Sequence, residues 1–222
     1  MEIKFLGHSS FEIKGKDTTV VTDPFDPKKV GFPFPKVEAD IVTVSHDHGD
    51  HNFVEGVGSL PAGRQGDPFV ISGPGEYEVQ GVRVFGISAF HDDKKGAERG
   101  KTTLYLIEMD DLSLIHLGDL GHKLEHDQVE ELNSVDVLMI PVGGVYTINA
   151  ETAAEVVAQL EPYIVLPMHY QTPNLKLSKG LDKVEKFLEQ MGEENVRREK
   201  KLKVSKSSLP DDTEVVVLER SE

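Results

Sequence analysis

The feature that most constrains the fold is a group of metal-binding side chains directly after an apolar, β-branched segment. Residues 41–44, Ile-Val-Thr-Val, have the composition of a short buried strand. The seven residues that follow, Ser45-His46-Asp47-His48-Gly49-Asp50-His51, place four candidate ligands within six positions: His46, His48, Asp50 and His51. Imidazole and carboxylate suit Zn²⁺, Fe²⁺ or Mn²⁺. A loop at the end of a rigid strand loses little freedom on binding, so the segment predicts a metal site at a strand end.

Histidines and aspartates follow other strand-like runs in the same way. The runs cover residues 3–7, 18–22, 82–90, 112–118 and 164–168, and the residues that follow them are His8, Asp23, His91, Asp119 and His169. Taken singly, each of these residues is better explained as a loop histidine or a turn aspartate. Because strands that end at one edge of a fold bring their last side chains together, we expect the five to converge with the histidine cluster.

The predicted elements change character along the chain. Strand-like runs dominate the first half, and an Asp110-Asp111 pair between two of them predicts a hairpin turn. After Asp119, helical spacing of apolar residues over 125–132, 150–160 and 181–191 alternates with runs at 135–141, 163–167 and 213–218. Asn149 is the expected N-cap of the second helix. This order predicts a layered α/β or α+β domain whose helices cover sheet faces.

Composition narrows the class of protein. A chain of 222 residues can build one domain or two fused halves. Its net charge of −15 disfavours nucleic-acid binding, because such a protein repels phosphate backbones. The chain has no cysteine, which excludes disulfides and thiolate metal sites. The N-terminus lacks the apolar core of a signal peptide, and no apolar run approaches the ~20 residues of a membrane span. We therefore expect a cytoplasmic protein with no membrane segment, in an oligomeric state that the sequence leaves open.

The pattern His-x-His-x-Asp-His, followed by a later histidine, a Gly-Asp pair and a final histidine, resembles the metallo-β-lactamase superfamily. In this chain the pattern corresponds to residues 46–51, His91, Gly118-Asp119 and His169. The resemblance implies an α/β (α+β) fold, a four-layer αβ/βα sandwich. It also implies a single domain over residues 1–222, made of two similar halves that meet near residue 110.

Three other segments are similar to one branch of that superfamily, the small hydrolases related to ascorbate-6-phosphate lactonases. They are Gly7-His8-Ser9-Ser10, Gly73-Pro74-Gly75-Glu76-Tyr77 and Pro141-Val142-Gly143-Gly144-Val145-Tyr146-Thr147. Most members of this branch have no assigned substrate, so the resemblance indicates the chemistry better than the biological role.

Carried over position by position, the resemblance implies a dinuclear metal site. The expected ligands of the first metal are His46, His48 and His91. Those of the second metal are Asp50, His51 and His169, and Asp119 is the expected bridge. Asp23 is expected to support the histidine loop through hydrogen bonds without touching a metal. Where the family usually has threonine before the first histidine, this chain has Ser45, which retains the hydroxyl.

The implied function is that of a metal-dependent hydrolase. Two divalent ions, with zinc favoured and manganese or iron open, would share a hydroxide that attacks a small ester, lactone or phosphoester. Asp50 is expected to orient that hydroxide or take its proton. Protonation of the leaving group requires an acid of near-neutral pKa, for which His8 and His122 are the candidates, although each also fits a structural or surface histidine. The expected partner is a small-molecule substrate, either neutral or anionic.

Two other functions share these ligands. One is a nuclease similar to RNase Z, against which the charge of −15 and the lack of an RNA-binding arm count. The other is a non-catalytic metal-binding module, although a scaffold needs fewer than seven ligands. Glyoxalase II-like thioesterases are set aside because too little chain follows His169 for their helical domain. Flavodiiron proteins are set aside because His48 stands where they have glutamate.

Several polar segments have more ordinary interpretations. His116 is expected in the core and His126 on the surface. Arg99, Lys94 and Lys95 follow His91, and they predict a solvated loop, with binding of a substrate anion as the alternative. The segment 197–206 has six basic residues and is expected to be solvated, with an anionic partner as the alternative. Gly143 and Gly144 predict either a tight turn or an anion-binding loop.

Overall fold

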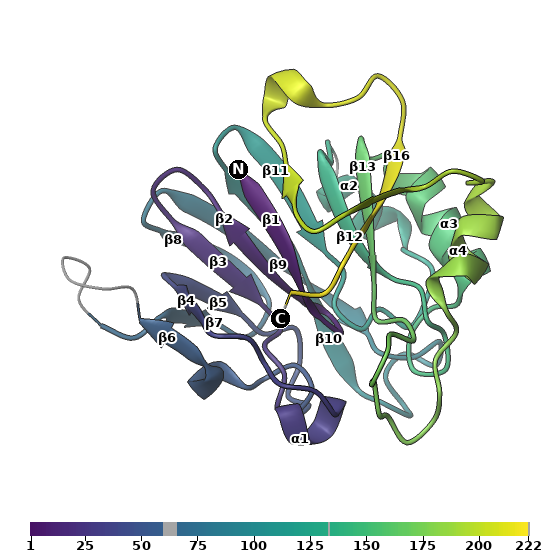
Figure 1. Ribbon diagram of the computed structural model, residues 1–222, viewed down its shortest axis with the longest axis horizontal. Coiled ribbons are helices and arrows are strands. Elements are labelled where there is room, and N and C mark those ends of the chain that lie inside the picture. The colour runs from purple at the N-terminus through teal and green to yellow at the C-terminus, as the bar shows by residue number, and fades with distance from the viewer. Residues whose placement is uncertain (60–65, 133, 222) are drawn as a thin grey trace.

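Two facing β-sheets form the centre of the protein (Figure 1), in a computed structural model that describes residues 1–59, 66–132 and 134–221. The first sheet has the order β15 (Leu202–Lys203), β1 (Glu2–Gly7), β2 (Ser10–Lys14), β3 (Thr19–Thr22), β5 (Ile41–Thr43), β7 (Phe69–Ile71). The second has the order β14 (Arg197–Glu199), β16 (Glu214–Leu218), β13 (Ile164–Met168), β12 (Val137–Pro141), β11 (Leu112–His116), β10 (Lys101–Met109), β9 (Val82–Phe90), β8 (Gly75–Val79). A small third sheet pairs β4 (Val37–Ala39) with β6 (Val57–Ser59).

The first sheet is buried on both faces. Successive apolar side chains of its strands point to opposite faces of the sheet, so each face has its own apolar contacts. On β3 and β5, Val20 and Ile41 enter the main core between the sheets, whereas Val21 and Val42 point to the other face. That outer face is covered by the β4–β6 pair and the short 3-10 helix η1 (Val54–Gly56).

The second sheet changes from antiparallel to parallel pairing along its width. Strands β8 to β11 are antiparallel, and β11, β12, β13 and β16 are parallel. Asp110 and Asp111, with φ of 52° and 62°, form the predicted hairpin turn between β10 and β11. Strands β12 and β13 are buried at every position, as parallel strands covered on both faces must be.

The longer helices lie on the outer face of the second sheet (Figure 1). Helix α3 (Ala150–Leu160) is capped by Asn149, whose side chain accepts a hydrogen bond from Thr152 N, and it buries Val156 and Leu160. Helix α4 (Val184–Met191) contacts α3. The remaining helical elements are α1 (Pro27–Val30), α2 (His126–Glu131) and the 3-10 helix η2 (Lys206–Ser208).

The layered α/β architecture that the sequence predicts is confirmed, with differences in detail. The predicted helix 181–191 begins at Val184, because Leu181 packs instead with Phe25 and Val30 beside α1. The predicted loop 56–66 contributes residues 57–59 to β6, and its residues 60–65 lie outside the described residues. The chain passes from the first sheet to the second between β7 and β8, and the proposed division near residue 110 stays a prediction.

Among the described residues, no helix is both long and apolar enough to span a membrane.

Candidate metal centre

The predicted site residues follow strands of both sheets at one edge of the molecule. His8 follows β1 and Asp23 follows β3, and the segment 45–51 comes shortly after β5. From the second sheet, His91 follows β9, His169 follows β13, and Asp119 lies three residues beyond the end of β11. Helix α1 lies beside the histidine segment, because the N–H of Asp26 donates to the carbonyl of Gly49 at 2.9 Å. The convergence expected from the strand-end pattern is therefore present.

The backbone turns sharply where three of these residues leave their strands. His8, Asp23 and His169 have φ of 56°, 39° and 49°, in the left-handed region that costs a non-glycine residue about 1–2 kcal/mol. The N–H of His169 donates to the carbonyl of His8 at 2.7 Å, which joins the two sheets at this edge. Strain of this kind persists only where the surrounding fold holds it, and it is concentrated at functional sites.

Asp119 is at the centre of the cluster. Its Oδ2 is 3.3 Å from Nε2 of His51, 3.3 Å from Nε2 of His169, 3.4 Å from Nε2 of His91 and 4.0 Å from Nε2 of His46. The carboxylate is 2 % exposed. Imidazoles from both sheets thus surround one buried carboxylate oxygen.

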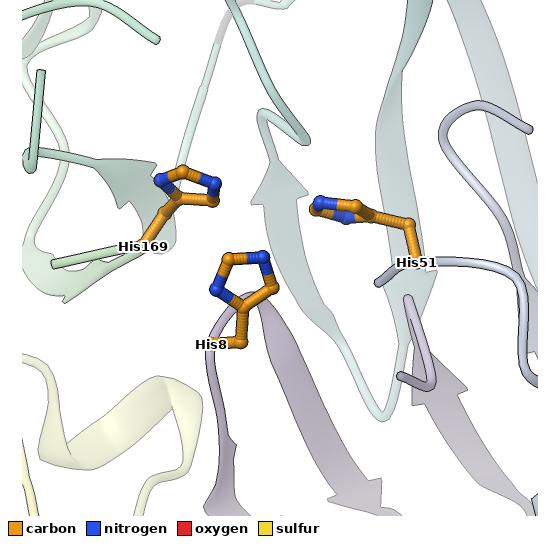
Figure 2. Close-up of side chains that lie close together, drawn as sticks. All are labelled: His8, His51 and His169. Atoms are coloured by element: carbon orange, nitrogen blue, oxygen red, sulfur yellow. The ribbon is translucent and has the colours of Figure 1, made fainter. Parts of the chain in front are cut away.

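Two separate groups of three histidines meet near Asp119, and a third group, His46, His51 and Asp119, shares one histidine with each. His46, His48 and His91 form the first, with their candidate ligand atoms within 4.8 Å of one another. His8, His51 and His169 form the second by the same measure, and Figure 2 shows their rings close together. The first group matches the predicted ligands of one metal.

In the second group, His8 takes a place that was predicted for Asp50. The Oδ2 of Asp50 is 3.8 Å from Nε2 of His51 and 3.3 Å from Nε2 of His8. The side chain of Asp50 is 28 % exposed and that of His8 is 0 % exposed. Asp50 therefore lies between the buried histidines and the solvent.

Asp23 forms hydrogen bonds with the histidine segment, as predicted. Its Oδ1 accepts a hydrogen bond from Ser45 N at 2.8 Å, and its Oδ2 accepts one from Ser45 Oγ at 2.6 Å. His51 Nδ1 lies 2.9 Å from the same Oδ2, so Nε2 of His51 is directed toward Asp119. Ser45 Oγ is also 2.9 Å from His46 Nδ1, so this hydroxyl couples Asp23 to a second histidine.

The buried polar atoms of the cluster fit a metal ion. Within the described parts of the chain, His51 Nε2, Asp119 Oδ1 and both ring nitrogens of His8 are buried without a hydrogen-bond partner. Leaving such an atom unsatisfied costs about 1–3 kcal/mol, and native proteins rarely concentrate several in one place. The nitrogen and oxygen donors are those of Zn²⁺, Mn²⁺ or Fe²⁺ sites.

The electrostatics of the cluster also suit a cation. Burial lowers the pKa of His46 to about 3 and that of His8 to about 4, so both imidazoles are neutral at pH 7. Burial acts against ionisation of Asp119, but the nearby His169 and His51 outweigh it and hold the pKa of Asp119 well below its usual range. Burial likewise opposes the charging of His51, yet Asp119 and Asp23 together raise its pKa well above normal. The buried carboxylates therefore favour positive charge at the centre.

A cavity of about 370 Å³ opens onto the cluster. It reaches the candidate ligands His48, Asp50, His91, Asp119 and His169. The rest of its lining is Lys29, Arg99, Tyr146, Lys176, Leu177 and Ser178. Its volume lies at the lower end of the ~300–1,000 Å³ range of ligand pockets, which favours a small molecule as its occupant.

Other residues singled out in the sequence lie away from the cluster. His122 accepts a hydrogen bond from Phe90 N at Nε2, and its Nδ1 lies 2.7 Å from the carbonyl of Lys123. Both ring nitrogens of His122 therefore contact backbone groups, and His122 is not among the residues that line the cavity described above. His116 is buried and bonded to Ser9 O, and the side chain of His126 is 83 % exposed, as expected for each.

The basic segment 197–206 makes ion pairs within the chain. Its partners are Glu199 and Glu214 for Arg197, Glu185 for Arg198, Glu2 for Lys201 and Asp136 for Lys206. Much of its charge is therefore balanced internally, in keeping with the solvated interpretation.

Two cavity residues, Lys29 and Lys176, were not predicted from the sequence. Lys29 is on the single turn of α1, and Lys176 follows His169 in an irregular segment. The signal that would have found Lys29 is the Asp26-Pro27 pair, which caps and begins a helix close behind Asp23.

Comparison with known proteins identifies the family of the chain. A family model described as the β-lactamase superfamily domain matches residues 2–169. A protein of Thermococcus onnurineus, named a UPF0173 metal-dependent hydrolase, is 30 % identical and is covered over 78 % of this chain and 85 % of its own. A protein of the same name from Pelotomaculum thermopropionicum is 31 % identical, with the same coverage.

Solved structures show the same fold. A Thermotoga maritima protein proposed to be a zinc-dependent hydrolase of the metallo-β-lactamase superfamily is 35 % identical, with a TM-score of 0.77 over 98 % of this chain and 97 % of that one. Igni18, a metallo hydrolase from Ignicoccus hospitalis, shares the fold at 20 % identity, with a TM-score of 0.62 over 100 % of this chain and 96 % of that one. The chain therefore belongs to the metallo-β-lactamase superfamily and, within it, to the UPF0173 group of metal-dependent hydrolases.

Proposed function

We propose that the protein binds two divalent metal ions, most favourably zinc, and hydrolyses an ester, lactone or phosphoester bond of a small molecule. The observation that carries this proposal is the position of Asp119, whose Oδ2 lies within 4.0 Å of four imidazole nitrogens from both sheets. One carboxylate close to imidazoles of both histidine groups can balance the charge of two cations at once, which supports a dinuclear site.

The proposed ligands divide as the histidine groups do. His46, His48 and His91 would hold one ion. His51 and His169, with Asp50 at the solvent side, would hold the other, and Asp119 would contact both. When bound, such a pair of ions supplies Lewis acidity and lowers the pKa of water toward neutrality. The neutral imidazole of His46 supplies a free electron pair for this binding, and His51, whose pKa is raised, would release its proton when the ion binds.

We assign His8 a positioning role and not the role of proton donor that the sequence suggested. Its ring is fully buried, and its Nε2 lies 3.3 Å from the partly exposed carboxylate of Asp50. The ring of His8 therefore lies behind Asp50 and limits where its carboxylate can move, and Asp50 is the group that faces the cavity and can accept a proton from the attacking water. His122 has no part in the proposed chemistry, because backbone groups engage both its nitrogens.

The first test is the metal content of untagged, purified protein, measured by elemental mass spectrometry. We expect close to two metal ions per chain, and loss of metal together with hydrolytic activity in Asp119→Ala. His126→Ala is the matched control, because this histidine is exposed on α2, where its Nε2 lies 3.3 Å from Glu130. It should retain both metal and activity.

Two results would contradict the proposal. Metal near zero after reconstitution with zinc, manganese and iron would remove the metal centre. Two bound metals without hydrolysis of any ester, lactone, thioester or phosphodiester in a broad panel would instead favour the non-catalytic module.

A further inference from the structure

We propose that the substrate carries an anionic group, phosphate or carboxylate, which Lys29, Arg99 and Lys176 bind at the mouth of the metal cavity. This inference rests on the proposed hydrolase function, because it concerns the same cavity. The three side chains come from α1, from the loop after His91 and from the segment after His169, and all three line the cavity.

The charge at this mouth contrasts with that of the whole chain. The protein has a net charge of −15, yet three cationic side chains gather around one small cavity. The carboxylates that also line it, Asp50 and Asp119, are associated with the histidines. The acidic surface of the chain already favours solubility, so these three cations are not needed for that purpose. A cavity lined by positive charge attracts an anion.

These three charges have no carboxylate partner in the described structure. Within residues 1–59, 66–132 and 134–221, no Asp or Glu oxygen lies within 4.0 Å of a side-chain nitrogen of Lys29, Arg99 or Lys176. By contrast, Lys94 on the same loop as Arg99 forms an ion pair with Glu98. The cavity cations therefore remain available to a ligand.

Arg99 is held in position by the loop that carries it. Asp92 accepts hydrogen bonds from the backbone N–H groups of Lys94, Gly96, Glu98 and Arg99, at 2.7 to 2.9 Å. The guanidinium donates to the carbonyl of Val145 at 3.2 Å and lies over the ring of Tyr146, 5.8 Å from its centroid. A half-buried, fixed guanidinium presents its remaining N–H groups in the planar geometry that binds phosphate or carboxylate.

Backbone and packing contacts connect the segments of Lys29 and Lys176 to the histidine segment of the metal centre. Lys29 lies against Gly49 of the histidine segment, where a side-chain carbon added to Gly49 would come within 3.2 Å of Lys29 Cε. The N–H of Lys176 donates to the carbonyl of Val30 at 2.9 Å, which fixes its segment to the end of α1. The hydroxyls of Tyr146 and Ser178 lie 2.6 Å apart at the same mouth, so one donates to the other and a single hydroxyl hydrogen is left for an oxyanion.

The decisive experiment compares two esters with the same leaving group. The neutral ester is para-nitrophenyl benzoate, and the anionic ester is the mono-para-nitrophenyl ester of terephthalic acid, whose rigid ring keeps the carboxylate from attacking its own ester. With zinc-loaded protein, Arg99→Met should lower kcat/KM for the anionic ester about tenfold while changing that for the neutral ester by less than about twofold. Arg99→Lys should recover part of the loss, because it restores charge without the planar fork. Lys94→Met is the matched control and should alter neither rate.

A second measurement is independent of hydrolysis. Calorimetric titration with inorganic phosphate should show binding to the zinc-loaded wild type that weakens with added salt and falls at least about tenfold in the triple variant Lys29→Met, Arg99→Met, Lys176→Met. Unchanged phosphate affinity in that variant, or an equal loss of rate on both esters, would overturn the inference. If neither ester is hydrolysed by the wild type, the proposed function is in doubt, and the phosphate titration still decides whether the cations bind an anion.

Discussion

Replacement of Asp23 by asparagine tests whether a residue that touches no metal controls the metal site. Asp23 is fully buried and accepts hydrogen bonds from Ser45 N and Ser45 Oγ, with His51 Nδ1 2.9 Å from its Oδ2. The asparagine side chain would keep an oxygen for Ser45 N. Its amide NH₂ would replace the oxygen that faces both Ser45 Oγ and His51, and it cannot accept from either.

The size of the effect follows from these two lost contacts. Hydrogen bonds to a charged acceptor contribute about 1.5–3 kcal/mol each, so their combined loss is at most about 3–6 kcal/mol. An amide is less costly to bury than a carboxylate, which reduces the expected loss in free energy of unfolding to about 2–4 kcal/mol. His51 would no longer be held with Nε2 toward Asp119, so metal affinity should fall about 10–100-fold.

Metal affinity is measured by competition with a chromophoric chelator, and stability by urea unfolding followed by circular dichroism. Asp136→Asn is the matched control, because Asp136 is also buried and accepts from Ser113 N at 2.9 Å and Lys206 Nζ at 2.8 Å. It precedes β12, at the end of the strand away from the site, so its replacement should reduce stability and leave metal affinity unchanged. If folded Asp23→Asn bound metal as tightly as the wild type, the support assigned to Asp23 would be refuted.

Two further perturbations have defined outcomes. Stripping metal with a chelator should lower Tm, and restoring zinc at a free concentration about 100 times Kd should recover about 2.7 kcal/mol of stability. An unchanged Tm in protein that has lost its metal by elemental analysis would count against the centre. Gly121→Ala should destabilise the protein by about 1–3 kcal/mol and lower its metal content, because overpacking here falls on rigid backbone. A Cβ at Gly121 would lie 2.2 Å from Asp92 N and 2.3 Å from His91 C, whereas at the control position Gly58 the nearest atom is a Glu38 side-chain carbon at 3.3 Å. Equal metal content and stability in the two alanine variants would contradict this prediction.

Elements with strong local signals are predicted best from the sequence. Helix α3 spans Ala150–Leu160 as predicted, because its apolar period and its Asn149 cap specify the same boundaries. Strand β2 (Ser10–Lys14) was not predicted. Its inward pair, Phe11 and Ile13, is too short a pattern to stand out, and its pairing with β1 and β3 is what makes it a strand. Helix α1 has four residues and therefore no detectable period.

The residues of the candidate site also fall into those with a local sequence signal and those that only long-range contacts bring into place. Its histidines and aspartates could be picked out because they follow strand-like runs, and the edge at which strands end is where such side chains meet. The position of His8 next to Asp50 could not be predicted, since it depends on how β1 lies against the histidine segment. Lys29 and Lys176 are ordinary exposed lysines in the sequence, and only long-range contacts of α1 bring them to the cavity.

The cluster draws its side chains from both sheets, and this has a mechanical consequence. His46, His48 and His51 follow a strand of the first sheet, whereas His91, Asp119 and His169 follow strands of the second. Ions bound by residues of both groups would cross-link the two sheets, so that the sheets could not separate without breaking metal–ligand bonds. Binding of the ions should then slow amide hydrogen exchange in the inner strands of both sheets together, and the two sheets of the loaded protein should open as one cooperative unit.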